Sequence, residues 1–170
     1  MKKSLITALI LLPGNALVFI PALIVWLTRE TSFAVQIVGP SHVFFWVGVA
    51  AAAKGFILMA WTMRDFLAHG KGTPAPWAPP QRLVVRGPYR HVRNPMISGV
   101  MLALVAESLI LRSLPVGLWL AAFVAANMIY IPLREEPGLE KRFGGAYRLY
   151  KANVPRWFPR MRAWRPPDGG

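Results

Sequence analysis

Four apolar runs, each about as long as a membrane-spanning helix, constrain this sequence more than any other feature. They cover residues 5–27, 41–63, 96–111 and 114–133, and roughly 20 apolar residues in a helix cross the hydrocarbon core of a bilayer. The stretch between the second and third runs is polar and rich in Pro and Gly, so it can neither span a bilayer nor lie in bare lipid. The pattern predicts an all-α, polytopic membrane protein with four transmembrane helices.

The first run partly resembles a secretory signal, because it follows Lys2 and Lys3 and passes a small-residue site near residues 14–16. The apolar stretch nevertheless continues beyond this site to residue 27, which gives it the length of a span. We therefore expect a retained transmembrane helix.

The distribution of basic residues predicts the orientation of the helices. Seventeen of the twenty Lys and Arg residues lie before the first run, between residues 64 and 95, or after residue 133. Only Arg29 and Arg112 lie in the other two connections, and Lys54 lies within a run. Because cytoplasmic loops carry the excess of Lys and Arg, both termini are expected to be cytoplasmic.

The net charge of +13 is compatible with two partners, a nucleic acid or anionic lipid. The charge follows the ends of the apolar runs and no nucleic-acid-binding motif is present, so we expect a membrane bilayer and no nucleic acid. The absence of Cys excludes disulfides, thiolate metal sites and Cys nucleophiles, and no metal site is expected. The oligomeric state stays open.

The chain is expected to form a single membrane-embedded domain, residues 1–170, because four spans already use about half of it. Residues 1–63 would hold two spans, 64–95 a cytoplasmic loop, 96–133 a helical hairpin and 134–170 a cytoplasmic tail. In the tail, Leu139, Phe143, Tyr147 and Tyr150 recur at helical spacing, which predicts a short amphipathic helix. The segment VPRWFPRMRAW then alternates aromatic and basic residues, as interfacial anchors do.

Two further features are considered as functional sites, a glycine-rich segment and a lysine within an apolar run. The segment GKGTP at residues 70–74 is not a phosphate-binding loop, because Lys71 precedes Gly rather than Ser or Thr and the segment follows a membrane helix. Lys54 is an ionisable residue within a span, and such residues usually face a cavity or a partner. It is either a substrate-cavity residue or a structural one.

The stretch RGPYRHVRNPMISG, residues 86–99, is expected to form an anion-binding site. Pro95 suits the first turn of a helix, whose amides would then point into the loop. Arg86, Arg90 and Arg93 place fixed cations beside that helix start. The stretch would receive a carboxylate or a phosphate, and the alternative is that its arginines contact only lipid headgroups.

A carboxylate pair, Glu135 and Glu136, follows the fourth run. Adjacent residues on a helix point about 100° apart, so one carboxylate would face inward and the other would face water. Asn127 and Arg134 lie on nearly the same helix face and extend a polar stripe toward the membrane. The alternative is a solvated helix end, although carboxylates are unfavourable at a helix C-terminus.

The order of these motifs resembles that of the membrane methyltransferases of the isoprenylcysteine carboxyl methyltransferase and phospholipid N-methyltransferase superfamily. The likeness rests on GKGTPAPWAPPQRLVVRGPYRHVRNPMISG, an apolar hairpin, and EEPGLEKRFGGAYRLYKANVPRWFPR. It implies an integral enzyme of the bacterial or archaeal inner membrane that takes S-adenosylmethionine from the cytoplasmic side. The implied substrate is a lipid or prenylated acceptor, such as an isoprenylcysteine carboxylate or a phospholipid amine.

The resemblance also implies roles for individual residues. Arg93, Glu135 and Glu136 would be the catalytic residues. The cofactor-binding residues would be Gly87, Pro88, Tyr89, Arg90, His91, Arg93, Asn94, Gly99, Glu135 and Glu136. A closing segment that is mainly structural matches at Phe143, Gly144, Tyr147, Tyr150, Val154 and Pro155. The substrate cavity would include Lys54, Ile97, Asn127 and Tyr130.

Two of these positions depart from the family pattern. The family commonly has an aromatic residue where this chain has Ile97, and many relatives have a His where it has Asn127. The chemistry of the remaining residues suits S-adenosylmethionine: Arg and helix-start amides suit its carboxylate, Glu its ammonium or ribose, and Tyr or His its adenine. Methyl transfer needs alignment and exclusion of water rather than a metal.

Two other functions remain as alternatives. Membrane sterol reductases, which use NADPH, also have an Arg-(His/Asn)-Pro stretch and a later acidic pair. A non-catalytic relative that retains the fold is the second alternative, because Ile97 and Asn127 depart from the family pattern.

Overall fold

A computed structural model describes residues 10–70 and 81–167 of the chain. Within these ranges the fold is helical, as predicted, and no residue forms a strand. The elements in order are η1 (Ile10–Phe19), α2 (Ile20–Thr28), α3 (Val43–His69), η2 (Gly87–Arg90), α4 (Pro95–Ile110), α5 (Leu114–Tyr130), η3 (Ile131–Glu135) and α6 (Glu136–Asn153). Lys2, Lys3 and residues 71–74 of the rejected phosphate-binding loop lie outside the described residues.

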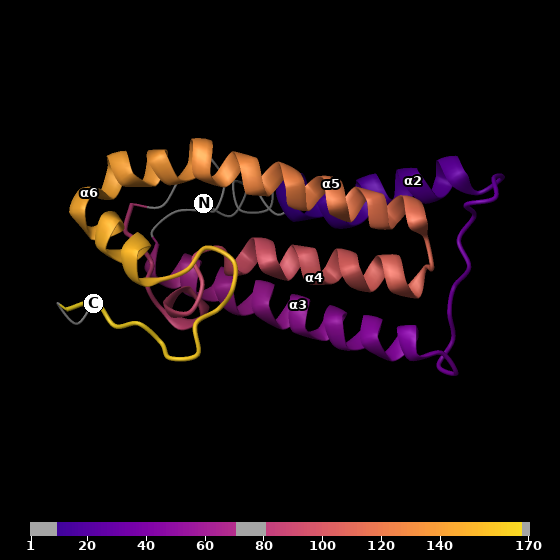
Figure 1. Cartoon of the computed structure of the whole chain (residues 1–170), viewed down its shortest axis with the longest axis horizontal. Helices are drawn as coiled ribbons and strands as arrows, with labels where there is room; N and C mark the ends of the chain where they lie inside the picture. Colours follow the sequence, from indigo (N-terminus) through magenta and orange to yellow (C-terminus); the bar gives the residue numbers. More distant parts are fainter. Residues whose placement is uncertain (1–9, 71–80, 168–170) are drawn as a thin grey trace.

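The long helices lie side by side along one axis, with the connections at the two ends (Figure 1). Among the described residues, two helices are long and apolar enough to cross a membrane: Val43–His69 and the continuous helical stretch Leu114–Asn153. Pro13–Thr28 and Pro95–Ile110 are shorter apolar helices. Four spans and cytoplasmic termini therefore stay predictions.

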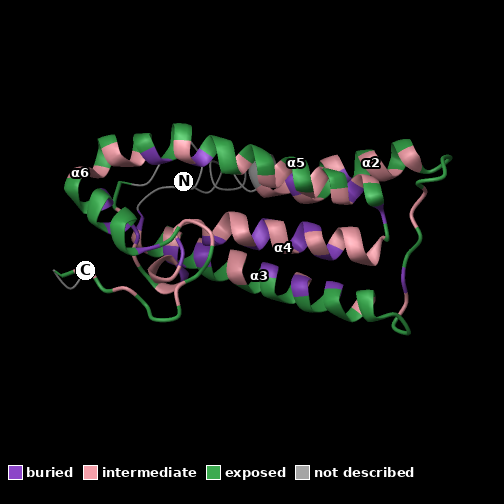
Figure 2. Ribbon diagram, viewed as in Figure 1, coloured by how far each residue is buried: buried purple, intermediate pink, exposed green. Residues whose placement is uncertain are grey.

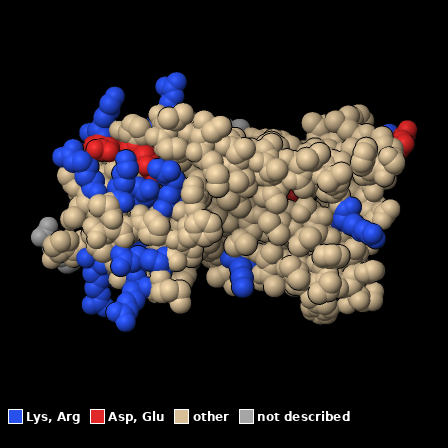
Figure 3. All heavy atoms as spheres, in the orientation of Figure 1, with Lys and Arg blue, Asp and Glu red and all other residues tan. Residues whose placement is uncertain are grey.

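Large apolar side chains cover the outside of this bundle. Only 11% of the most apolar window of each long helix is buried, and exposed residues run along α3 and α5 (Figure 2). The core helix of a soluble protein would be mostly buried, so these faces need an apolar environment such as lipid. Lys and Arg side chains gather instead at the end of the molecule that holds α6 (Figure 3).

Close backbone packing joins α3 to α4. A Cβ atom added at Gly55 would lie 2.7 Å from the carbonyl oxygen of Gly99 and 3.1 Å from the amide of Ala103. A Cβ at Gly99 would likewise lie 2.9 Å from the Gly55 carbonyl oxygen. Small residues allow helices in membranes to approach in this way, and the contact fixes the start of α4 against α3.

We expect Gly55→Ala to destabilise the protein by about 1–3 kcal/mol, because the new methyl group meets backbone atoms that cannot rotate away. Thermal unfolding in nanodiscs would measure this loss. Gly117→Ala is the matched control, since its Cβ would meet nothing closer than the Ser108 Cβ atom at 3.9 Å. Equal melting temperatures for the two variants would contradict the close-packing account.

The fourth apolar run does not end in a separate tail helix, as the sequence suggested, but continues through η3 into α6. Pro132 lies within η3, which has π-helical geometry. Proline has no amide hydrogen to donate to the helical hydrogen bond at this position. A π-turn accommodates this loss and rotates the side chains that follow. Gly144, with a non-helical φ of 55° and ψ of −127°, then interrupts α6 and kinks it into two helical segments. The expected amphipathic tail helix is thus a bent continuation of α5.

The tail, residues 154–167, returns across the loop of residues 81–94. The amide of Arg93 donates to the carbonyl oxygen of Pro155 at 2.9 Å, and the Arg160 amide donates to the His91 carbonyl oxygen at 2.9 Å. The Trp164 amide donates to the Arg90 carbonyl oxygen at 3.0 Å. The aromatic and basic tail, interpreted from sequence as an interfacial anchor, therefore also pairs with the loop and braces it.

Candidate functional site

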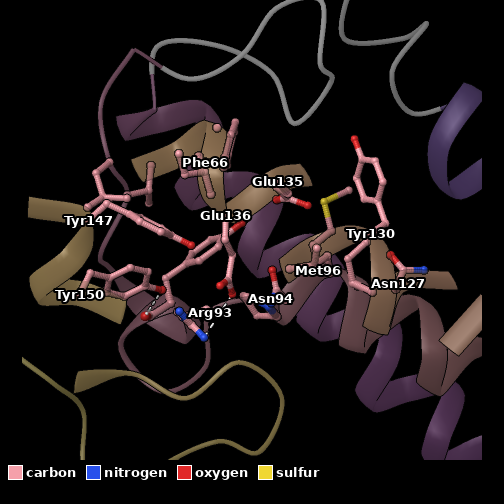
Figure 4. A pocket seen from close by; sticks show the side chains of 18 of the residues that line it. Phe66, Arg93, Asn94, Met96, Asn127, Tyr130, Glu135, Glu136, Tyr147 and Tyr150 are labelled. Atoms are coloured by element: carbon pink, nitrogen blue, oxygen red, sulfur yellow. Dashed lines mark hydrogen bonds and ion pairs between the residues drawn. The ribbon is translucent and has the colours of Figure 1, made fainter. Parts of the chain in front are cut away.

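A cavity of about 570 Å³ lies at the charged end of the bundle, between α4, α5, η3, α6 and the loop of residues 81–94. The close-up places Arg93 and Glu136 near Tyr147 and Tyr150, whereas Met96, Asn127 and Tyr130 lie toward the other side (Figure 4). The predicted site residues among those that line the cavity are Tyr89, Arg93, Asn94, Ile97, Asn127, Tyr130, Glu135 and Glu136.

Arg93 lies just before α4 with a side chain that is only 9% exposed. Its Nη2 atom lies 3.2 Å from Oε1 of Glu136. The remaining guanidinium nitrogens, Nε and Nη1, are buried and have no hydrogen-bond partner among the described residues. Buried donors without partners cost about 1–3 kcal/mol each, so an anionic acceptor beside these two nitrogens would stabilise the folded chain.

Glu136, the first residue of α6, is the centre of an ion-pair network. Arg156 donates two hydrogen bonds to it from one edge of its planar guanidinium, with Nε 2.7 Å from Oε1 and Nη2 2.9 Å from Oε2. Lys151 Nζ lies 3.7 Å from Oε2. Burial alone would raise the pKa of this carboxyl, but the hydrogen bonds from Arg156 and the charges of Arg93, Arg156 and Lys151 lower it. Glu136 is therefore an anion at neutral pH and holds Arg93 in place.

Arg156 was missed by the sequence analysis. It lies between Pro155 and Trp157 in the stretch that was interpreted as an interfacial anchor. Its carbonyl oxygen also accepts a hydrogen bond from Nδ2 of Asn94 at 3.3 Å. The available signal was a basic residue directly after the Val-Pro that closes the family-like segment, but only the return of the tail shows that it reaches Glu136.

We expect the protein to lose stability in acid as Glu136 becomes protonated. Its pKa in the folded state lies below the ordinary value of 4.5, so its contribution is complete above that value and disappears as the pH falls through the lowered pKa. Glu136→Gln should lower the stability at neutral pH by about 3 kcal/mol, because the buried Arg93 loses its charged partner, and should flatten the acid slope. Melting temperatures measured from about pH 7 to about pH 3 would show both effects.

Glu140→Gln is the control for this measurement, because Glu140 pairs with Arg148 at 3.9 Å and with Lys151 at 3.7 Å near the surface. Pairs of this kind contribute at most about 1 kcal/mol. A Glu136→Gln variant with an unchanged acid slope would contradict the assignment.

Glu135 lies in a different environment. Its side chain keeps accessible surface and lines the cavity, and no described residue forms a hydrogen bond or ion pair with its carboxylate. Loss of hydration against the protein wall raises its pKa, and the negative charge of Glu136 raises it further. The two carboxylates therefore lie in different environments, as expected, with Glu136 buried and Glu135 facing the cavity.

Three tyrosines form an aromatic wall beside Arg93. The Tyr150 hydroxyl donates to the carbonyl oxygen of Tyr89 at 2.8 Å, and the rings of Tyr147 and Tyr150 are 6.1 Å apart. Burial raises the pKa of all three phenols, so they stay neutral. Neutral aromatic faces of this kind can border a planar base such as adenine.

Several other residues that line the cavity are apolar. Ile97 and Asn127 line it together with Pro13, Val100 and Phe123. Nδ2 of Asn127 donates to the carbonyl oxygen of Phe123 at 2.8 Å, which leaves its Oδ1 atom as the acceptor available to the cavity. Apolar lining residues with few polar groups among them suit the chain of a lipid-like molecule.

Six predicted site residues lie outside the cavity lining. Lys54 is exposed on α3, and Gly99 forms the contact between α3 and α4 described above. Arg90 Nε donates to the carbonyl oxygen of Trp164 at 3.0 Å, and Nδ1 of His91 lies 2.8 Å from the carbonyl oxygen of Arg160. Arg90 and His91 therefore hold the tail.

Gly87 and Pro88 form the turn before these residues. Gly87 has a φ of 50°, which favours glycine, and a Cβ atom there would collide with the Asp65 carboxylate and approach Trp61 Nε1 to 2.8 Å. The carbonyl oxygen of the buried Pro88 accepts from the amides of His91 and Val92 at 3.0 and 3.1 Å. This turn packs the loop against α3 and thereby positions Arg93.

The described residues contain no group of three His, Asp or Glu side chains arranged to hold a metal ion. Arg93, the acidic pair and the neutral tyrosines fit an amino-acid carboxylate joined to a planar base, since no residue in the ranges 10–70 and 81–167 pairs with Nε and Nη1 of Arg93. S-adenosylmethionine has both of these groups.

One family model, described as phospholipid methyltransferase, matches residues 43–146, which is more than half of the chain. No curated protein and no solved structure matches this chain.

Proposed function

Because the chain belongs to the phospholipid methyltransferase family, we propose that it transfers a methyl group from S-adenosylmethionine to a lipid-type acceptor. The family itself suggests methyl transfer to a lipid-type substrate, and the apolar helices suggest a membrane protein. The methyl donor, the face of the membrane and the site residues belong to the proposal. The observation that carries it is the buried Arg93 guanidinium, with two donors that no described residue uses.

In this account Arg93 binds the carboxylate of the donor, because a buried cation without a full set of partners favours an anion. Glu136 and Arg156 orient Arg93, and the tyrosine wall borders the adenine. When bound, S-adenosylmethionine supplies an electrophilic methyl group on a sulfonium sulfur. The chain's own contribution is to align the acceptor with that methyl group and to exclude water.

The apolar chain of the acceptor packs against apolar residues that line the cavity, such as Val100 and Phe123. We propose four membrane-crossing segments with both termini in the cytoplasm, which places the cavity at the cytoplasmic face. Support comes from the gathering of Lys and Arg side chains at this end (Figure 3), since anionic lipid and the positive-inside rule both favour that placement.

Calorimetric titration of the full chain in nanodiscs tests the choice of methyl donor. S-adenosylmethionine should bind with a stoichiometry near one site per chain, and NADPH should give no heat of binding. NADPH binding without S-adenosylmethionine binding would overturn the proposal in favour of the reductase. Binding of neither molecule would favour a non-catalytic relative.

A further inference from the structure

The two adjacent glutamates differ in how far their oxygens are already engaged. Both carboxylate oxygens of Glu136 accept hydrogen bonds from Arg156, at 2.7 and 2.9 Å, and Arg93 and Lys151 add their charges. The Glu135 carboxylate has no hydrogen bond or ion pair with any residue that the structure describes. Of these two glutamates, Glu135 is therefore the one whose carboxylate oxygens are open to a molecule in the cavity.

Glu135 also lies toward a different part of the cavity. In the close-up it lies near Met96 and Tyr130, while Glu136 lies beside Arg93 (Figure 4). Tyr130 and Asn127 line the same side, and Nδ2 of Asn127 is engaged by the Phe123 carbonyl oxygen. This side combines hydrogen-bond acceptors with the apolar side chain of Met96, so it suits a positively charged group carried by an apolar chain.

We propose that Glu135, and not Glu136, contacts the methyl acceptor and removes the proton from a nitrogen nucleophile. The inference rests on the proposed function, because it takes a sulfonium methyl donor for granted. Glu136 is then a positioning residue for the donor site, and the two carboxylates serve the two substrates separately.

The reaction moves one proton from the amine to Glu135 and one methyl group from sulfur to nitrogen. A protonated amine cannot attack, because its lone pair is bonded to hydrogen. The amine nitrogen gives that proton to the Glu135 carboxylate and then forms a bond to the methyl carbon, while the carbon–sulfur pair stays on sulfur as a thioether. Glu135 afterwards releases its proton to water.

The surroundings of Glu135 support this role in two further ways. A carboxyl with a raised pKa is a better proton acceptor at neutral pH than an ordinary one, and hydration loss together with Glu136 raises the pKa of Glu135. Arg134 and Arg142 line the same cavity and would attract an anionic group on the acceptor. A carboxylate nucleophile, by contrast, would approach the negative charge of Glu135.

The test uses the full chain in nanodiscs with tritiated methyl donor and three probe acceptors. The probes are phosphatidylethanolamine, the same lipid with an acetylated amine, and a farnesylated cysteine with a free carboxylate. Wild type should label only the free amine. Glu135→Gln should lower this rate by about 100-fold or more with donor affinity unchanged, and Glu135→Asp should retain part of the rate. Glu140→Gln, outside the cavity lining, should match wild type.

Three results would overturn the assignment of Glu135. They are unchanged turnover in Glu135→Gln, a loss of donor affinity in both Glu135→Gln and Glu135→Asp, and labelling of the farnesylated carboxylate in preference to the amine. If wild type binds no S-adenosylmethionine, the proposed function itself fails and this inference fails with it. If the donor binds but Glu135 does not affect the rate, only the inference fails.

Discussion

Replacing Arg93 with alanine is expected to weaken binding of S-adenosylmethionine by about 100-fold, or ~3 kcal/mol. The physical reason is that the Arg93 side chain is only 9% exposed and that two of its nitrogens have no hydrogen-bond partner in the described part of the chain. Removing it takes away the charge and both donors at once. Calorimetric titration of the variant in nanodiscs would measure the change.

The fold should survive this substitution. The hydrogen bond between residues 93 and 155 involves only backbone atoms, and Glu136 keeps Arg156 and Lys151 as partners. Arg93→Lys should recover part of the affinity, because an ammonium retains the charge but lacks the planar fork through which a guanidinium donates two parallel hydrogen bonds to a carboxylate. Arg148→Ala is the control, since Arg148 is exposed on α6 and lies outside the cavity lining. Wild-type donor affinity in Arg93→Ala would contradict the account.

Arg156→Ala is expected to weaken donor binding by about tenfold or more and to destabilise the fold by about 3 kcal/mol. Arg156 lies in the tail and donates two hydrogen bonds to Glu136. Without them Glu136 relies on Lys151 and on Arg93, whose guanidinium is then drawn away from the donor. Calorimetry and thermal unfolding would measure the two effects on the same preparation.

A double-mutant cycle distinguishes a positioning role from general damage to the tail. Glu136→Gln combined with Arg156→Ala should cost little more donor affinity than either change alone, because both remove the same interaction. Arg162→Ala, an exposed residue of the same tail, should bind the donor like wild type. Simple additivity of the two losses would show that Arg156 acts independently of Glu136.

Much of the fold is predictable because it depends on local patterns. Apolar length indicates the long helices, and α4 begins at Pro95, where a helix start was expected. The hairpin follows from the short link between residues 110 and 114. The continuous path from α5 into α6 is harder to predict, because Pro132 usually ends a helix and here is accommodated by a π-turn.

The site is predictable only where its residues adjoin a helix end. Arg93 and the acidic pair could be placed near each other once the hairpin was recognised. The role of Arg156 could not, because it depends on a tail that pairs with a loop some sixty residues earlier through backbone carbonyl groups. The same tail contacts explain why Arg90 and His91 hold the loop rather than line the cavity.

The most direct test of the central claim is methyl transfer by the wild-type chain. Nanodiscs made from a total membrane-lipid extract are incubated with tritiated S-adenosylmethionine, and the organic phase is counted and its labelled lipid identified. We expect label in the lipid fraction of the wild type, loss of that label in Arg93→Ala and its retention in Arg148→Ala. Absence of label from the lipid fraction of wild-type protein that binds the donor would contradict the central claim.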